Sequence, residues 1–162
     1  MKLRNPDKIK ISTANLSTEK TQVCFETLKD CAEVYVSSRD ELRFVTLRWN
    51  FTEDEKRKDI FKILGDVWER SYGDLAWRTM EPERAMPWYF AVSNGSDSVR
   101  DFSGRFTECF GVGVRPGAMC CWQYDPMGVT LILDLRNGGL PVQLGERRLL
   151  AATVYFREYR DI

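Results

Sequence analysis

The sequence predicts an all-β protein, an antiparallel β-sandwich of the supersandwich type with at most one or two short helices. Two observations support this. Many short segments alternate apolar and polar residues over the length of a strand. Turn sequences rich in glycine, proline, asparagine and aspartate separate them. The chain has 162 residues, which suits one domain with its own core. We therefore expect a single sandwich domain spanning residues 1–162.

The first half of the chain contains four predicted strands. They cover residues 8–14, 22–28, 32–38 and 41–51, with Lys29-Asp30 as the turn between the second and third. In the third strand Val34 and Val36 share a face, and Tyr35 faces the other way. The fourth strand is the longest, and its apolar side chains fall on one face, so we expect it inside a sheet. Those side chains are Val45, Leu47, Trp49 and Phe51.

A helix is predicted in one segment only, residues 52–62. Thr52 stands where an N-cap residue would, and Glu55 follows three positions later. This spacing is typical of a capping box, in which each side chain bonds the backbone N–H of the other residue.

The second half contains five more predicted strands. They cover residues 88–92, 109–114, 119–124, 129–135 and 149–157. Residues 78–87 contain two prolines and are predicted to be a plain connection, and residues 93–106 a loop or weak hairpin tip. In the fourth of these strands Leu131, Leu133 and Leu135 share one face, opposite Ile132 and Asp134.

The composition excludes several classes of function. The 24 lysines and arginines balance the 24 aspartates and glutamates, which argues against nucleic-acid binding through phosphates. No apolar run is long enough to cross a bilayer, so no membrane partner is expected. The first residues, Met1–Lys8, lack the apolar core of a signal peptide. We therefore expect a cytoplasmic protein.

The absence of histidine and the arrangement of the cysteines limit the chemistry further. Without histidine, a Ser-His-Asp or Cys-His site within this chain is excluded. The five cysteines show no C-x-x-C spacing, so no metal and no cofactor are expected. We expect all five to be reduced and mostly buried thiols. The adjacent Cys120 and Cys121 should point to opposite faces of a strand.

The segment Gly65–Trp77 is the candidate functional site. Its aromatic residues Trp68, Tyr72 and Trp77 have two interpretations: a stacking platform for a sugar ring, or a plug over the edge of the core. The glycines Gly65 and Gly73 predict sharp turns at both ends of the segment.

The charged residues of the same segment also allow alternatives. Glu69 and Asp74 would suit a pair of catalytic carboxylates only if they lay at the right separation in space, and solvated side chains are the commoner case. Arg70 with Asp74 forms either an ion pair that fixes the loop or a clamp on a ligand, and the ion pair is the ordinary outcome.

The segment Leu64–Trp77 resembles a segment in the N-terminal β-domain of bacterial α-galactosidase-like proteins, which are related to glycoside hydrolase family 36. Further matching motifs follow in order: Met86–Phe90, Gly111–Val114, Cys120–Gly128, Leu133–Gly139 and Gly145–Leu149. The resemblance covers about residues 40–157. The sequence departs from the family pattern in three places: Ser71 replaces a glycine, Cys121 replaces an aromatic residue, and Val114-Arg115 replaces Lys-Thr.

The resemblance implies a role without catalysis in this chain. Family members join such a domain to a (β/α)₈ barrel, and two aspartates of the barrel cleave the α-galactoside. A barrel needs about 250 residues, so those aspartates lie outside this chain, which would be the N-terminal part of a longer protein. The resemblance implies that the domain packs on the barrel, supports oligomer contacts and lends the Trp68–Trp77 loop to the rim of the sugar pocket.

The partners expected are therefore the barrel of the same chain, a galactoside and a second copy of the protein. The substrate-binding or interface residues would be Trp68, Glu69, Arg70, Tyr72, Asp74 and Trp77. Two alternatives stay open. One is a free-standing carbohydrate-binding β-sandwich, and the other is a structural interaction domain.

Overall fold

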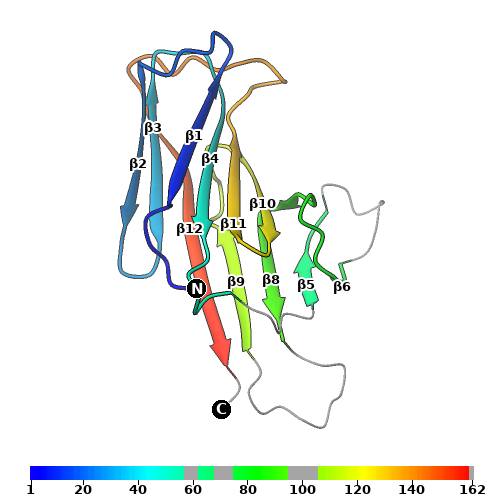
Figure 1. Cartoon of the computed structure of the whole chain (residues 1–162). Helices are drawn as coiled ribbons and strands as arrows, with labels where there is room; N and C mark the ends of the chain where they lie inside the picture. The colour runs from blue at the N-terminus through cyan, green and yellow to red at the C-terminus, as the bar shows by residue number, and fades with distance from the viewer. Residues whose placement is uncertain (57–61, 68–74, 95–105, 161–162) are drawn as a thin grey trace.

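A computed structural model of the chain describes residues 1–56, 62–67, 75–94 and 106–160. Over these residues the chain forms twelve strands and no helix. The strands make two antiparallel sheets, of five and seven strands, that pack face to face (Figure 1). The predicted all-β sandwich is therefore confirmed. In the same residues no helix is long and apolar enough to cross a membrane.

The five-stranded sheet has the order β1-β4-β11-β10-β7. Its strands are β1 (Lys8–Thr13), β4 (Leu42–Asn50), β11 (Gly128–Asp134), β10 (Met119–Asp125) and β7 (Met86–Pro87). The seven-stranded sheet has the order β2-β3-β12-β9-β8-β5-β6. Its strands are β2 (Thr21–Thr27), β3 (Ala32–Ser38), β12 (Arg148–Arg160), β9 (Phe106–Val112), β8 (Tyr89–Ser93), β5 (Lys62–Gly65) and β6 (Trp77–Arg78).

All nine predicted strands are present, with ends shifted by a few residues. The longest early strand, β4, lies between β1 and β11, and its predicted apolar face is buried. Val34 and Val36 of β3 are also buried, while Tyr35 between them is half-buried. The alternating pattern therefore identified the core-facing side of these strands correctly.

Two predictions for the connecting segments are wrong. Residues 78–87 are not a plain connection, because Arg78 belongs to β6 and Met86-Pro87 form β7. Residues 52–56 form a turn instead of the start of a helix. The capping-box bonds do form there: the N–H of Glu55 donates to Thr52 Oγ1 at 3.3 Å, and the N–H of Thr52 donates to Glu55 Oε1 at 3.2 Å. Residues 57–61 lie outside the described part, and β5 begins at Lys62.

An aromatic cluster between the two sheets forms the centre of the core. Trp49 and Trp122 enter from the five-stranded sheet, and Phe90, Phe110 and Phe156 from the seven-stranded one. Phe90 stacks on Phe110 with the ring centroids 4.6 Å apart, and Phe156 meets Trp49 edge to face at 5.2 Å. Such contacts add to the free energy gained by burying the rings, so this cluster is the main link between the layers.

The prediction that the cysteines are mostly buried is wrong. All five are free thiols, but only Cys120 is fully buried, and the other four are half-buried. Cys120 and Cys121 do point to opposite faces of β10, as predicted, so only Cys120 reaches the core. Burial, with a smaller contribution from neighbouring Cys121, raises the pKa of Cys120 to about 12. This thiol is therefore protonated and unreactive at neutral pH.

Candidate functional site

Of the six residues predicted for the site, the structure describes Trp77. Trp68, Glu69, Arg70, Tyr72 and Asp74 lie in residues 68–74, outside the described residues. The candidate carboxylate pair and the candidate ion pair of the loop therefore remain predictions. Trp77 itself is 43% exposed.

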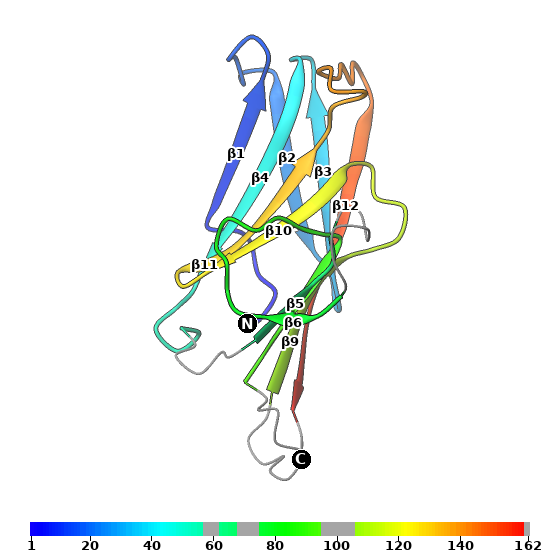
Figure 2. The same ribbon diagram turned by 90° about the vertical axis from the view of Figure 1, so that its right-hand side faces the viewer.

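Trp77 belongs to the outermost strand of the seven-stranded sheet. β6 pairs with β5, and Trp77 lies directly opposite Leu64. Figure 2 views the molecule from the side on which β5 and β6 face the reader. Leu75 and Met80, close to Trp77 along the chain, are also exposed. We call Leu75, Trp77 and Met80 the β6 surface. Single exposed apolar residues are common on protein surfaces, but three within six residues form a cluster.

The outer face of the seven-stranded sheet continues the β6 surface inward. Across β6, β5, β8 and β9 the register places Trp77, Leu64, Ala91 and Cys109 opposite one another. We call these four residues the outer strip, because side chains that lie opposite each other share a face of the sheet. Ala91 is only 6% exposed although it faces away from the core. Burial also raises the pKa of Cys109. The outer strip is thus a partly buried apolar surface.

A second row of side chains lies two residues further along the same face. Gly111 of β9 stands between Tyr89 of β8 and Tyr155 of β12. Tyr89 is exposed and Tyr155 is half-buried. Strands lie about 4.8 Å apart, so the Cα atoms of Tyr89 and Tyr155 lie about 10 Å apart, on either side of Gly111. We call Tyr89, Gly111 and Tyr155 the tyrosine row. The Tyr155 ring lies beside Gly113, and the Arg157 guanidinium carbon is 5.2 Å from the ring centroid.

At Trp88 the chain crosses from one sheet to the other. It stands between β7 of the five-stranded sheet and β8 of the seven-stranded one, with φ at +68°. Its N–H donates to the carbonyl of Cys120, and its own carbonyl accepts from the N–H of Val112, each at 3.1 Å. The indole N–H of Trp122 donates to the same carbonyl at 3.1 Å. These bonds to both sheets offset the cost of an unusual backbone conformation.

Gly65 is required by packing and not by a turn. It is the last residue of β5, and a Cβ built on it would lie 2.5 Å from Met86 Sδ. The Arg84 side chain donates to the Gly65 carbonyl at 3.3 Å. The prediction of a sharp turn at Gly65 is therefore wrong: the glycine lets the β7 segment pack closely on β5. Gly73 lies outside the described residues.

A small apolar hollow lies beside Trp88 and was not predicted from the sequence. It has a volume of about 300 Å³ and is lined by Trp88 and the turn Val112–Pro116. That turn bulges from the sandwich between β9 and β10 (Figure 2). Arg115 adopts φ of +56° there, and the Val114 side chain is almost fully exposed. Trp88 and residues 112–114 of this hollow belong to two of the motifs quoted from the sequence.

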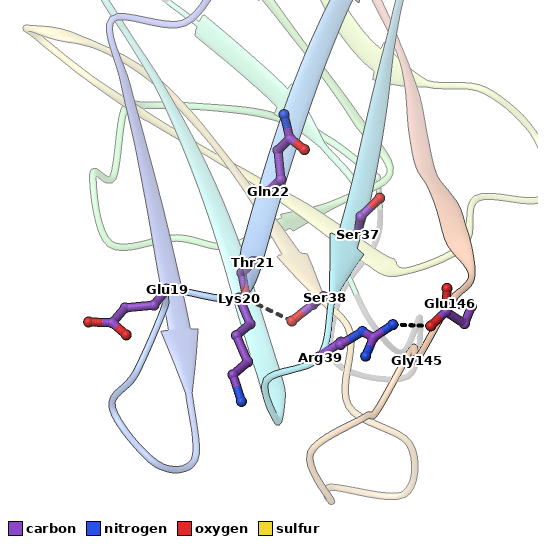
Figure 3. A pocket seen from close by; sticks show the side chains of 9 residues that line it. All are labelled: Glu19, Lys20, Thr21, Gln22, Ser37, Ser38, Arg39, Gly145 and Glu146. Carbon is purple, nitrogen blue, oxygen red and sulfur yellow. Dashed lines mark hydrogen bonds and ion pairs between the residues drawn. The ribbon is translucent and has the colours of Figure 1, made fainter.

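A larger polar pocket lies at the other end of the sandwich, beside β2 and β3 (Figure 3). Its volume is about 450 Å³, and it was also missed from the sequence, although Gly145-Glu146 belongs to the last matching motif. Arg39 pairs with Glu146 across it. The lining residues are Glu19, Lys20, Thr21, Gln22, Ser37, Ser38, Arg39, Gly145 and Glu146. The lining carries both signs of charge and no aromatic ring.

The described residues show neither a metal-ligand cluster nor a histidine base. Among them, no group of three or more cysteines, aspartates or glutamates is placed to hold a metal ion. The chain has no histidine to act as a base beside a nucleophile. The arrangement at the β6 edge is instead an apolar strip with aromatic residues at its rim, which can pack against a protein or a sugar ring.

Comparison of the chain with protein-family models gave no match, and neither did comparison with curated protein sequences or with solved structures. Function must therefore be inferred from the residues and their arrangement.

Proposed function

We propose that this chain is a non-catalytic accessory domain of an α-galactosidase-like glycoside hydrolase. It packs on a (β/α)₈ barrel through the β6 surface and the outer strip. The Trp68–Trp77 loop then reaches the rim of the sugar pocket, where it contacts the galactoside. The ordered series of motifs from Leu64 to Leu149 supports the choice of family.

The proposal rests on one observation: Trp77 is exposed on β6, the outermost strand, where the outer strip ends. Interfaces between proteins are enriched in aromatic residues at their buried centre. Trp77, Leu75 and Met80 are exposed together, and Leu64 and Ala91 continue the apolar surface inward. A barrel seated on this edge would remove the β6 surface from water and would cover the short edge strand β6.

A free-standing carbohydrate-binding sandwich is the second candidate, and the tyrosine row favours it. Tyr89 and Tyr155 lie on either side of Gly111, where a Cβ would meet nothing closer than 3.5 Å, the Tyr89 Cβ. The glycine leaves room for a sugar to lie on the sheet beside the Tyr89 side chain. The third candidate, a structural interaction domain, would use the same β6 surface without a sugar.

Replacement of Trp77 by alanine in the protein joined to its barrel tests the proposal. Loss of an interface anchor costs about 2 kcal/mol, so domain docking or galactoside binding should weaken about 30-fold. Tyr159→Ala is the matched control, because Tyr159 is 60% exposed and lies near the end of β12, away from β6. It should cost close to nothing. Equal effects of the two variants would contradict the proposal.

Two measurements separate the candidates. The accessory-domain proposal requires a reading frame that continues past the codon for Ile162 into a barrel, and an isolated chain that does not cleave an aryl α-galactoside. The free-standing carbohydrate-binding sandwich would be favoured by a reading frame that ends after the codon for Ile162, together with galactose binding that Tyr89→Ala abolishes. A frame that stops without sugar binding would favour the structural domain.

A further inference from the structure

Exposed sheet edges attract other strands unless the protein protects them, and this sandwich protects its edges unequally. β6 and β7 are only two residues long. β1 carries Lys8 and Lys10, and its pairing with β4 shifts register between Ser12 and Thr13. β2 has seven residues, with no lysine, no proline and no break in its pairing with β3. Among the described strands, β2 is therefore the long edge without protection.

The backbone groups that β2 presents follow from its bonds to β3. The N–H of Leu28 donates to the carbonyl of Cys31 at 2.8 Å, and the carbonyl of Lys20 accepts from the N–H of Arg39 at 3.1 Å. Hydrogen-bonded residues alternate along an antiparallel pair, so the even-numbered residues of β2 bond to β3. The N–H and C=O groups of Val23, Phe25 and Thr27 consequently point away from the sheet. Figure 1 shows β2 at the outer margin of the molecule, beyond β1.

The side chains of β2 also leave apolar surface at this edge. Val23 and Phe25 pack on the core but are only half-buried, and Phe25 meets Trp49 edge to face at 5.8 Å. On the outer face Gln22 and Glu26 are exposed, and Cys24 between them is half-buried. Glu26 is held by Arg148 at 2.7 Å. A strand added here would cover the flanks of Val23 and Phe25.

We propose that two copies of this chain associate through β2, antiparallel, about a two-fold axis at Cys24. In this register Val23 lies opposite Phe25 of the second copy, Thr21 opposite Thr27, and Gln22 opposite Glu26. Each pair is chemically matched: apolar with aromatic, threonine with threonine, amide with carboxylate. No like charges oppose each other. The two seven-stranded sheets become one continuous sheet, and the interface is isologous.

The hydrogen-bonding pattern agrees with this register independently of the side chains. The pairs of Val23 with Phe25 join residues whose N–H and C=O groups point outward, so they form hydrogen-bonded pairs. Cys24 then falls in a pair without hydrogen bonds, where the two Cα atoms lie about 4.5 Å apart. This distance is within the range for a disulfide. Formation of a disulfide between the two Cys24 residues would therefore indicate the proposed register.

Oxidative crosslinking of the 162-residue chain tests the register. Diamide takes two electrons from two Cys24 thiols, which release their protons and form one disulfide, while diamide is reduced to the hydrazine. We expect a disulfide-linked dimer for the unmodified chain and for Cys31→Ser, which retains Cys24 and removes the other half-buried thiol near β2. Cys24→Ser should remove the covalent dimer. Dimers crosslinked through another cysteine, or no dimer at all, would overturn the proposed register.

Sedimentation velocity without oxidant tests the association itself. A small edge-to-edge interface is expected to be weak, so the chain should be partly dimeric at about 100 μM. Val23→Pro removes the outward N–H of residue 23 without touching a bond to β3 and should shift the equilibrium to monomer. Val23→Ala loses similar packing, keeps the N–H and should still dimerise. A wild-type chain that stays monomeric, or a folded Val23→Pro variant that dimerises like Val23→Ala, would overturn the proposal.

Discussion

Arg48 and Asp125 form an ion pair on the five-stranded sheet. Arg48 donates to the two carboxylate oxygens of Asp125 at 2.5 and 3.0 Å, and the N–H of Met127 donates to the same carboxylate at 2.7 Å. Burial alone would raise the pKa of Asp125, but the hydrogen bonds from Arg48 and Met127 outweigh it, and the pKa lies below its ordinary value. The folded protein therefore favours the charged form of this carboxyl group.

Asp125→Asn should lower stability in a pH-dependent way. A lowered pKa in the folded state stabilises the protein fully above the ordinary pKa of aspartate, about 3.9, and this stabilisation is lost as the pH falls through the folded pKa. We expect the variant to lose about 1–2 kcal/mol of unfolding free energy at neutral pH, with the difference from wild type shrinking in acid. Urea unfolding at several pH values measures it. Asp54→Asn, at an exposed turn residue, is the control, and a pH-independent difference for Asp125→Asn would contradict the prediction.

At the scale of single elements, one glycine allows β11 to lie close to β4. Gly128 opens β11 opposite Asn50, and a Cβ built there would lie 2.2 Å from the Trp49 carbonyl oxygen and 2.9 Å from Arg48 Nη2. The first of these atoms is backbone and cannot move away without breaking the pairing of the two strands. Glycine is needed at this position because of close approach, not because of an unusual φ.

Gly128→Ala should therefore destabilise the protein, by about 1–3 kcal/mol or more, as overpacking does. Gly111→Ala is a matched control in another strand, since its Cβ would meet Tyr89 at an ordinary 3.5 Å. It should change the unfolding free energy by about 0.5 kcal/mol or less. Chemical denaturation of both variants measures the difference. Similar losses for the two would show that strand propensity, and not the Trp49 carbonyl, sets the effect.

The individual strands show how much of this fold can be predicted from the sequence. The alternating pattern and the turn sequences located β1 to β4 and β9 to β12, because a period of two survives in any strand long enough to show it. The aromatic residues of β8 located that strand. The alternating pattern did not find β5, β6 or β7, because the four residues of β5 and the two residues each of β6 and β7 are too short to show a period. The cap signal at Thr52 and Glu55 is a local hydrogen-bond pattern, and a turn satisfied it as well as a helix would.

The candidate site was predicted only in part, for a related reason. An unusual mixture of aromatic and charged residues marked the segment around Trp77. The outer strip and the tyrosine row depend instead on pairing between strands far apart in the chain, such as Tyr89 with Gly111 and Gly111 with Tyr155. Residue alternation gives the face of each strand but not its neighbours or register. These surfaces therefore became visible only once the strands were arranged in sheets.

At the scale of the whole molecule, the two halves of the sequence are interleaved. β4, from the first half, pairs with β11 from the second, and β12 pairs with both β3 and β9. The aromatic cluster likewise joins Trp49 to Trp122 and Phe156. Neither half can complete a sheet or the core alone, so partial unfolding would expose most of the apolar surface at once.

We therefore predict that residues 1–162 unfold as one cooperative unit. Trp49 and Trp122 are fully buried, so their fluorescence reports the core, whereas far-UV circular dichroism reports both sheets. In a Trp68→Phe/Trp77→Phe background, the remaining tryptophans at positions 49, 88 and 122 lie in the core or pack against it, and the two probes should give coincident urea transitions with one midpoint. The slope should match that of a domain of this size, about 1–3 kcal/mol/M. Two separated transitions would contradict a single domain and would indicate that one sheet retains structure after the aromatic cluster has opened.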